Sequence, residues 1–139
     1  MIAMRRWLLL LGSNLAHDTR VRDALERLSS LGQATPLTSI QHFPSHDGNR
    51  GEYYNALAVL AVDVPRGVLT DRLRQLEVAL GRRRDADGEV AIDVDILAMS
   101  DGERWLADTH ALAKGEFERL PVATLLRQAA ITAERDSSG

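Results

Sequence analysis

The stretch AIDVDILAM, residues 91–99, predicts a buried strand that carries two acidic side chains. A run this rich in apolar and β-branched residues is typical of a strand in the middle of a sheet. Because side chains alternate along a strand, Asp93 and Asp95 share one face and Val94 lies on the other. At about 3.3 Å of rise per residue, the two aspartate Cα atoms lie about 6.6 Å apart.

Two neighbouring carboxylates in an apolar setting repel each other and resist burial unless a cation joins them. Mg²⁺ on substrate phosphates suits such a pair, since it binds one or two carboxylates and completes its shell with water and phosphate oxygens. The alternative is a half-exposed edge strand whose Asp93 and Asp95 face water. The pattern alone leaves both interpretations open.

Strand and helix patterns alternate on either side of this stretch. Strands are expected at 7–11, 34–41 and 53–64, and a turn-rich loop at 42–52. Amphipathic helices are expected at 18–31, before Gly32, and at 65–80, before Gly81. A short strand at 104–107, a last helix at 121–133 and a frayed tail at 133–139 follow.

The order β-α-β-β-α-β predicts an α+β fold of the ferredoxin-like type: an antiparallel sheet with two helices on one face, here with a C-terminal helical extension. A chain of 139 residues is expected to form one domain over 1–139. This fold serves many functions, so it selects none of them.

Composition excludes several classes of function. A net charge of −3 and 4% aromatic residues argue against a nucleic-acid surface, including a ferredoxin-like RNA-binding module. The chain has no cysteine, so disulfides and thiolate metal sites are absent. The apolar run near the N-terminus is too short for a signal peptide, and no segment approaches the ~20 apolar residues of a membrane span. We therefore expect a cytoplasmic protein with no membrane partner; its oligomeric state is left open.

Four motifs occur in an order that resembles one enzyme family. They are LGSNL at 11–15, YYNA at 53–56, LE at 76–77 followed by LGR at 80–82, and IDVDIL at 92–97. Together they resemble the 6-hydroxymethyl-7,8-dihydropterin pyrophosphokinase family of folate biosynthesis, over about residues 7–125. The family's ferredoxin-like core agrees with the order of elements predicted above.

The resemblance implies an activity and a site. The family transfers pyrophosphate from ATP to the hydroxymethyl group of the reduced pterin and releases AMP. By this resemblance Asp93 and Asp95 hold two Mg²⁺ ions on the ATP phosphates, and both act in catalysis together with Arg82. The resemblance also assigns ATP contacts to Glu77, Arg82, Arg84, Ile96, His110 and Lys114, and pterin contacts to Gly12, Tyr53, Asn55 and Phe117.

Each of these residues also has a simpler interpretation. Tyr53 and Asn55 suit a flat heterocycle with a polar edge, or a strand-edge tyrosine beside a turn-forming asparagine. Phe117 suits the second face of the pterin, or an ordinary core. Glu77 suits the nucleotide, or a solvated charge beside Arg74 or Arg84.

The basic run and the segment after it offer weaker matches. The run 82–84 suits phosphate oxygens, or a solvated loop. Thr109 stands where the family has proline before the histidine, and Lys114 lies near a phosphate-binding arginine of the family. The roles of His42 and His46 are left open.

The chain departs from the family where catalysis would occur. Val90 stands at the position of an arginine that would touch both substrates. The loop 85–90 is shortened and has gained Asp85, Asp87 and Glu89, which repel polyphosphate unless they face water. Two hypotheses follow: a divergent but working Mg²⁺-dependent pyrophosphokinase, or a catalytically impaired paralogue that binds a pterin, a nucleotide or a protein partner.

Overall fold

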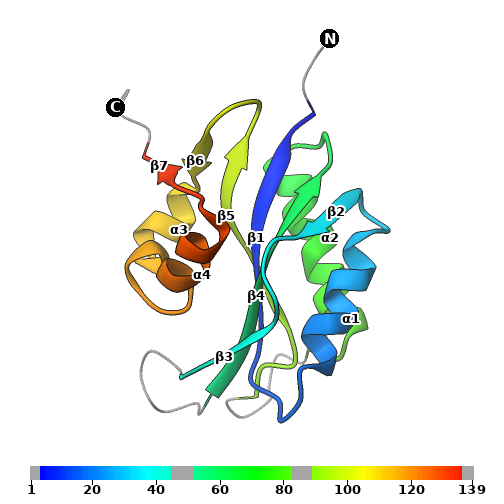
Figure 1. Cartoon of the computed structure of the whole chain (residues 1–139). Coiled ribbons are helices and arrows are strands. Elements are labelled where there is room, and N and C mark those ends of the chain that lie inside the picture. The colour runs from blue at the N-terminus through cyan, green and yellow to red at the C-terminus, as the bar shows by residue number, and fades with distance from the viewer. Residues whose placement is uncertain (1–3, 45–51, 83–88, 136–139) are drawn as a thin grey trace.

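The computed structural model describes residues 4–44, 52–82 and 89–135, and within them one mixed sheet lies between two layers of helices (Figure 1). The elements in chain order are β1 (Arg6–Ser13), α1 (Thr19–Leu28), β2 (Gln33–Pro36), β3 (Gln41–Pro44), β4 (Glu52–Ala61), α2 (Arg66–Ala79), β5 (Asp93–Ser100), β6 (Trp105–Ala107), α3 (Thr109–Ala113), the 3-10 helix η1 (Glu116–Glu118), α4 (Val122–Ala129) and β7 (Ala133–Glu134).

The strand order confirms the predicted fold class. The sheet runs β2-β4-β1-β5-β6-β7, with β3 also paired to β4. Every pair is antiparallel except β6 with β7. The four-strand core β2-β4-β1-β5, with α1 and α2 as the crossovers, is the arrangement that the β-α-β-β-α-β order predicts.

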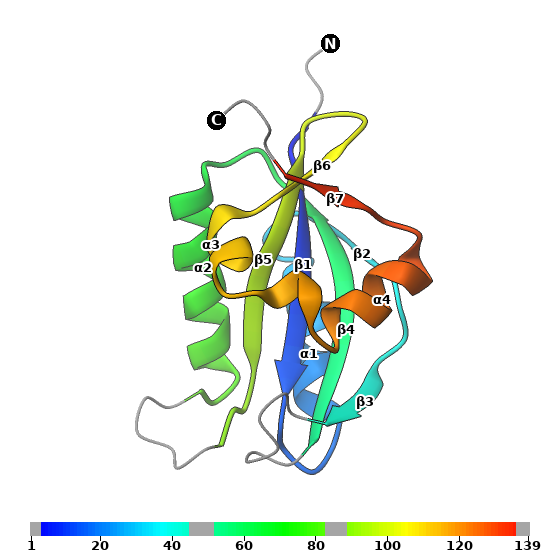
Figure 2. The ribbon, with the colours of Figure 1, turned by 90° about the vertical axis from the view of Figure 1, so that its left-hand side faces the viewer.

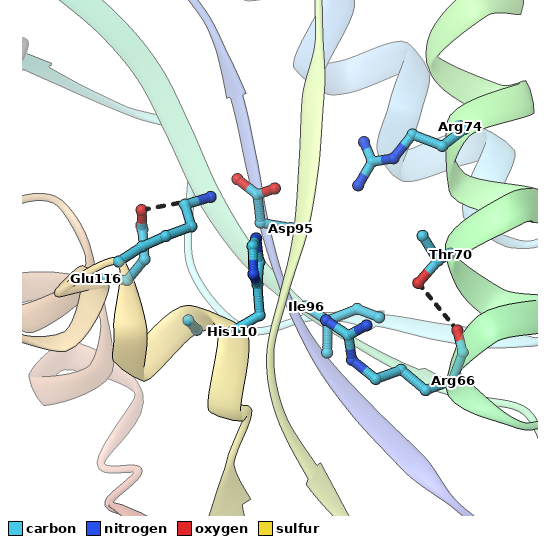
Figure 3. A pocket seen from close by; sticks show the side chains of 9 residues that line it. Arg66, Thr70, Arg74, Asp95, Ile96, His110 and Glu116 are labelled. Carbon is cyan, nitrogen blue, oxygen red and sulfur yellow. Dashed lines mark hydrogen bonds and ion pairs between the residues drawn. The ribbon is translucent and has the colours of Figure 1, made fainter.

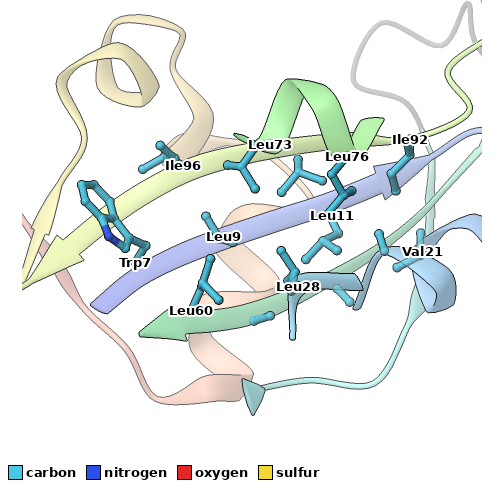
Figure 4. Close-up of a cluster of buried hydrophobic side chains, with 14 of the residues drawn as sticks. Trp7, Leu9, Leu11, Val21, Leu28, Leu60, Leu73, Leu76, Ile92 and Ile96 are labelled. Carbon is cyan, nitrogen blue, oxygen red and sulfur yellow. The ribbon is translucent and has the colours of Figure 1, made fainter. Parts of the chain in front are cut away.

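Each face of the sheet has its own apolar core. Helices α1 and α2 cover one face, and α3 and α4 cover the other, as the two ribbon views show (Figure 1, Figure 2). The first core places Leu9 and Leu11 of β1 against Leu28 of α1 and Leu73 of α2 (Figure 4). The second core includes Leu8, Leu10, Leu57, Leu97 and Leu125. The expected C-terminal helical extension therefore forms a layer of its own.

The predicted strand at 34–41 is divided into β2 and β3. Leu37 still donates its backbone N–H to Leu57 O at 2.9 Å. The Leu57 N–H, however, donates to the Thr38 hydroxyl oxygen at 3.1 Å. A side chain thus replaces the backbone acceptor, and the ladder stops until Gln41. Part of the predicted loop at 42–52 is consequently strand, and 45–51 lies outside the described residues.

The ends of several elements also differ from the sequence prediction. The last helix ends at Ala129, because Ala130 adopts a left-handed conformation with φ 57°. The tail expected to fray from 133 instead begins with β7, which pairs in parallel with β6. No helix among the described residues is long and apolar enough to cross a membrane.

Candidate functional site

Three central strands bring the predicted polar residues onto one face of the sheet. Gly12 of β1 pairs with Asn55 of β4 on one side and with Asp93 of β5 on the other. Asp95 lies opposite Leu10, whose side chain belongs to the core under α3 and α4. Since side chains alternate, all four site positions point to the face that carries the C-terminal helices.

Asp93 and Asp95 share this face as predicted, and both are half-buried while Val94 between them is buried. Burial is the main cause that raises the pKa of Asp95 to about 7, and the charge of Asp93 and a hydrogen bond to it raise the pKa further. Lys114 acts in the opposite direction. Both interpretations of the pair, as cation ligands or as a half-exposed strand face, therefore stay predictions. A divalent cation would favour the ionised form of Asp95, which burial and the charge of Asp93 disfavour.

Glu77 is buried, with 1% of its surface exposed, so its interpretation as a solvated charge is wrong. Its carboxylate accepts the Val94 backbone N–H at 2.8 Å and two hydrogen bonds from Arg74 Nη1 at 2.5 and 2.6 Å. Burial raises its pKa, while these donors lower it. Glu77 thereby joins α2 to the edge of β5 between the two aspartates.

Arg82 binds the same acidic cluster. Its Nη1 lies 2.5 Å from Asp93 Oδ1 and 3.5 Å from Glu77 Oε1. Burial lowers the pKa of Arg82, but the hydrogen bond and charge of Asp93 outweigh this effect and raise it. Arg74 Nη1 is 4.0 Å from the same Asp93 oxygen. Two arginines thus neutralise the carboxylates of Glu77 and Asp93.

A pocket of about 230 Å³ opens beside Asp95, between α2, β5 and α3 (Figure 3). Four residues predicted for ATP or metal binding line it: Asp95, Ile96, His110 and Lys114. Other lining residues are Arg66, Thr70, Arg74, Ala111 and Glu116. Three lysine or arginine side chains and one histidine surround this space, so its walls suit an anionic ligand.

Arg66, Thr70, Arg74 and Glu116 were not among the site residues predicted from the sequence. A signal existed, because residues 66, 70 and 74 are four apart and lie on one face of a helix. The apolar stripe of α2 predicted which face packs on the sheet, but it did not predict that residues 66, 70 and 74 lie beside β5. Asp108 was missed as well: it accepts Arg66 Nε at 2.6 Å and Arg66 Nη2 at 3.0 Å, and it caps α3 through the Ala111 N–H.

Two of the residues predicted for the pterin, Asn55 and Tyr53, lie on β4, on the other side of Gly12 from the aspartates of β5. Asn55 is 4% exposed and donates Nδ2 to Leu11 O at 3.2 Å. Its Oδ1 is buried and has no hydrogen-bond partner among the described residues. A Cβ on Gly12 would lie 2.6 Å from Asn55 Nδ2, so the amide occupies the space that only glycine leaves. This arrangement offers a buried acceptor to an N–H donor.

Tyr53 and Phe117 are both half-buried. Tyr53 pairs with Phe43 of β3, and its ring lies 3.8 Å from a Cβ built on Gly12. Phe117 of η1 packs against the core under α4, as the core interpretation predicts. Tyr53 therefore lies directly beside Gly12.

Val90, which stands where the family has an arginine, is tied to the β1–α1 loop. Its N–H donates to Asn14 Oδ1 at 2.6 Å, and its carbonyl accepts from Asn14 N at 3.0 Å and from Ser13 Oγ at 3.3 Å. Ser13 and Asn14 therefore anchor the segment that leads into β5. Arg84, Asp85 and Asp87 lie outside the described residues.

The described residues do not supply a full set of protein ligands for a metal ion. Among residues 4–44, 52–82 and 89–135, no group of three or more His, Asp or Glu side chains is arranged to hold a metal ion. Asp93 and Asp95 nevertheless fit a cation that takes its other ligands from a bound anion and water. Such a cation would compete with Arg82 for Asp93.

Comparison with known proteins gives one family. A sequence model of the family described as 7,8-dihydro-6-hydroxymethylpterin-pyrophosphokinase (HPPK) matches residues 8–131. A comparison with curated proteins gave no match. The matched region contains every site residue named above.

Proposed function

The chain belongs to the 7,8-dihydro-6-hydroxymethylpterin-pyrophosphokinase family, and on that premise we propose that it transfers pyrophosphate from ATP to 6-hydroxymethyl-7,8-dihydropterin in folate biosynthesis. One observation carries the proposal: Asn55 and Asp93 flank Gly12 on neighbouring strands, and a pocket lined with basic side chains lies beside them. The adjacent positions of Asn55, Gly12 and Asp93 suit a pterin that is bound next to a polyphosphate. The reaction would take place in the cytoplasm, the location expected from the sequence.

ATP would occupy the pocket between α2, β5 and α3, where His110, Lys114 and Ile96 line the wall. Asp93 and Asp95 would hold two Mg²⁺ ions together with the ATP phosphates. When bound, these ions neutralise charge on the transferred group and orient it. The raised pKa of Asp95 supports this assignment, because burial and the charge of Asp93 both disfavour its ionised form, which a bound cation would favour.

The pterin would lie over Gly12 and Tyr53. The unpaired Oδ1 of Asn55 supports this placement, since a buried acceptor is stable when a ligand N–H donates to it. Phe117 would contact the pterin from η1. The ligand's hydroxymethyl group would then face the aspartates on β5.

In the proposed reaction the pterin hydroxyl oxygen forms a bond to the β-phosphorus of ATP. The bond from that phosphorus to the oxygen bridging it to the α-phosphate breaks, and AMP leaves. One of the two aspartates accepts the hydroxyl proton. Arg82 would move from Asp93 to the phosphates, as its exposure of 40% and its place beside the aspartates permit.

A second candidate function rests on Val90. Its backbone is hydrogen-bonded to Asn14 and its side chain carries no charge, so this position offers no positively charged side chain to the phosphates. A paralogue that binds pterin, nucleotide or a protein partner without the usual turnover would fit this feature.

One experiment separates the two candidates. The purified chain is incubated with ATP, Mg²⁺ and hydroxymethyldihydropterin, and AMP release is followed. Release above a blank without pterin supports the pyrophosphokinase. No release, with calorimetric binding of ATP or pterin, supports the binding paralogue. Absence of both turnover and binding contradicts the pyrophosphokinase and a paralogue that binds pterin or nucleotide.

A further inference from the structure

Three lysine or arginine side chains line the pocket, and they differ in how fully they are already engaged. Arg66 uses two nitrogens on the carboxylate of Asp108, which has 8% of its side chain exposed. Lys114 lies 3.9 Å from Glu116. Arg74 uses only Nη1, which contacts Glu77 and lies near Asp93.

Arg74 therefore has hydrogen-bonding capacity to spare. Among the described residues, no hydrogen-bond partner contacts its Nε or Nη2, and 48% of its side chain is exposed. Figure 3 shows its guanidinium reaching from α2 across the pocket toward Asp95. Arg74 thus lines the pocket with two nitrogens, Nε and Nη2, that no described residue contacts.

Glu77 keeps Arg74 in this position. The Glu77 carboxylate is itself fixed by burial and by the Val94 N–H, so the arginine is held at one end by a rigid acceptor. A guanidinium held in this way loses little side-chain entropy when it binds an anion. Cations placed on Asp93 and Asp95 would also repel Arg74 from Asp93 and favour its contact with the anion they carry.

We propose that Arg74 is a phosphate-binding residue, which donates hydrogen bonds from Nε and Nη2 to the phosphates beyond the α-phosphate of the bound nucleotide. The choice of phosphates rests on the proposed function, in which the aspartates hold the cations of ATP. Arg74 would then provide positive charge that Val90 does not.

The test compares two arginines of one helix. Arg74→Gln removes the charge and keeps a side chain of similar polarity, and Arg72→Gln is the matched control, since Arg72 is exposed and does not line the pocket. Calorimetry measures binding of three probes with Mg²⁺: the non-hydrolysable α,β-methylene ATP, AMP, and inorganic tripolyphosphate. Thermal unfolding of each variant checks the fold.

We expect Arg74→Gln to weaken binding of the ATP analogue and of tripolyphosphate by about 10- to 100-fold, the usual effect of a lost charge-assisted hydrogen bond. AMP affinity should change by less than about twofold, and Arg72→Gln should resemble the wild type. Arg74→Lys is the second variant in case Arg74→Gln does not fold, because lysine can keep the pairing with Glu77. Its affinity for the ATP analogue should fall by an intermediate factor, because lysine cannot donate two parallel hydrogen bonds.

The outcomes separate this proposal from the proposed function. Unchanged analogue affinity in Arg74→Gln, or an equal loss for AMP, would overturn the role of Arg74. Tripolyphosphate binding that depends on Arg74, in a protein that releases no AMP from ATP and pterin, would uphold Arg74 and contradict the pyrophosphokinase. A wild type that binds none of the probes would overturn both.

Discussion

Glu77 on α2 accepts the backbone N–H of Val94 on β5 at 2.8 Å, although the two residues belong to different layers of the fold. This part of β5 pairs with β1 on one side only, because β6 pairs with β5 further along, at Ala98 and Met99. The carboxylate therefore satisfies a backbone donor that an edge strand leaves unpaired. It also fixes the strand between the two aspartates.

We predict that Glu77→Ala destabilises the fold by about 2–4 kcal/mol, because it leaves the Val94 N–H unpaired, removes the main partner of Arg74 and opens a cavity. Glu77→Gln should cost about half as much, since its amide oxygen can still accept the Val94 N–H. Urea unfolding measures both. Equal stability of Glu77→Ala and the wild type would show that the hydrogen bond contributes nothing.

Gly12→Ala should weaken pterin binding about tenfold or more while leaving ATP binding nearly unchanged. The new Cβ would lie 2.6 Å from Asn55 Nδ2, so the amide must turn away from its present position. Fluorescence or calorimetric titration with the pterin measures the change. Gly102→Ala is the control, because its Cβ would meet nothing within 4 Å. Equal loss in both variants would contradict a specific role for Gly12.

Stability in the absence of metal should fall as the pH rises from about 4 to about 7. An unfolded aspartate titrates near pH ~3.9, whereas Asp95 in the fold keeps its proton up to a pKa of about 7, so the unfolded state binds fewer protons across this range. Asp95→Asn should remove most of this dependence and be the more stable protein at pH 8 in EDTA. Thermal unfolding at pH 5 and pH 8 measures it. A wild type that gains stability over this range would contradict the raised pKa.

The same titration should control metal binding. Because Mg²⁺ and the proton compete for Asp95, the apparent Mg²⁺ affinity with the ATP analogue should fall about tenfold for each pH unit below ~7. Calorimetry at pH 6 and pH 8 measures this slope. Equal affinity at both values would mean that Asp95 is not a ligand of the cation.

Asp108→Ala should destabilise the fold by about 1–3 kcal/mol and weaken ATP binding. The carboxylate caps α3 at the Ala111 N–H and holds Arg66 of α2 through two hydrogen bonds. Its loss therefore removes the cap of α3 and the partner of Arg66, and these two elements line opposite sides of the pocket. Asp108→Asn keeps an oxygen for the cap and serves as the comparison. Wild-type ATP affinity in both variants would show that this contact between α2 and α3 does not shape the pocket.

The sequence predicted the parts of this molecule that depend on local patterns. The alternation in 91–99 placed Asp93 and Asp95 on one face, and the apolar stripes of the two long helices placed them over the first core. The order of the elements then predicted the strand order correctly.

The features that depend on distant contacts were not predictable in this way. Glu77 resembled a surface charge because its two partners, the Arg74 guanidinium and the Val94 N–H, are defined only when α2 packs against β5. Arg66 and Asp108 are 42 residues apart in the chain, and each alone looks like an exposed charge. The break between β2 and β3 depends on one hydroxyl, that of Thr38, which replaces a backbone acceptor.

The short strand β7 has a consequence for how the chain can be shortened or fused to another protein. Its residues Ala133 and Glu134 pair with Trp105 and Leu106 of β6, respectively, and β6 leads within two residues into the capped start of α3. A truncation before Ala133 would remove no residue that lines the pocket, yet it would leave β6 as a bare edge just ahead of Asp108 and His110. Fusion partners and purification tags attached downstream of β7 would preserve this pairing, whereas a cut a few residues earlier would remove it and leave the segment that leads into α3 less firmly held.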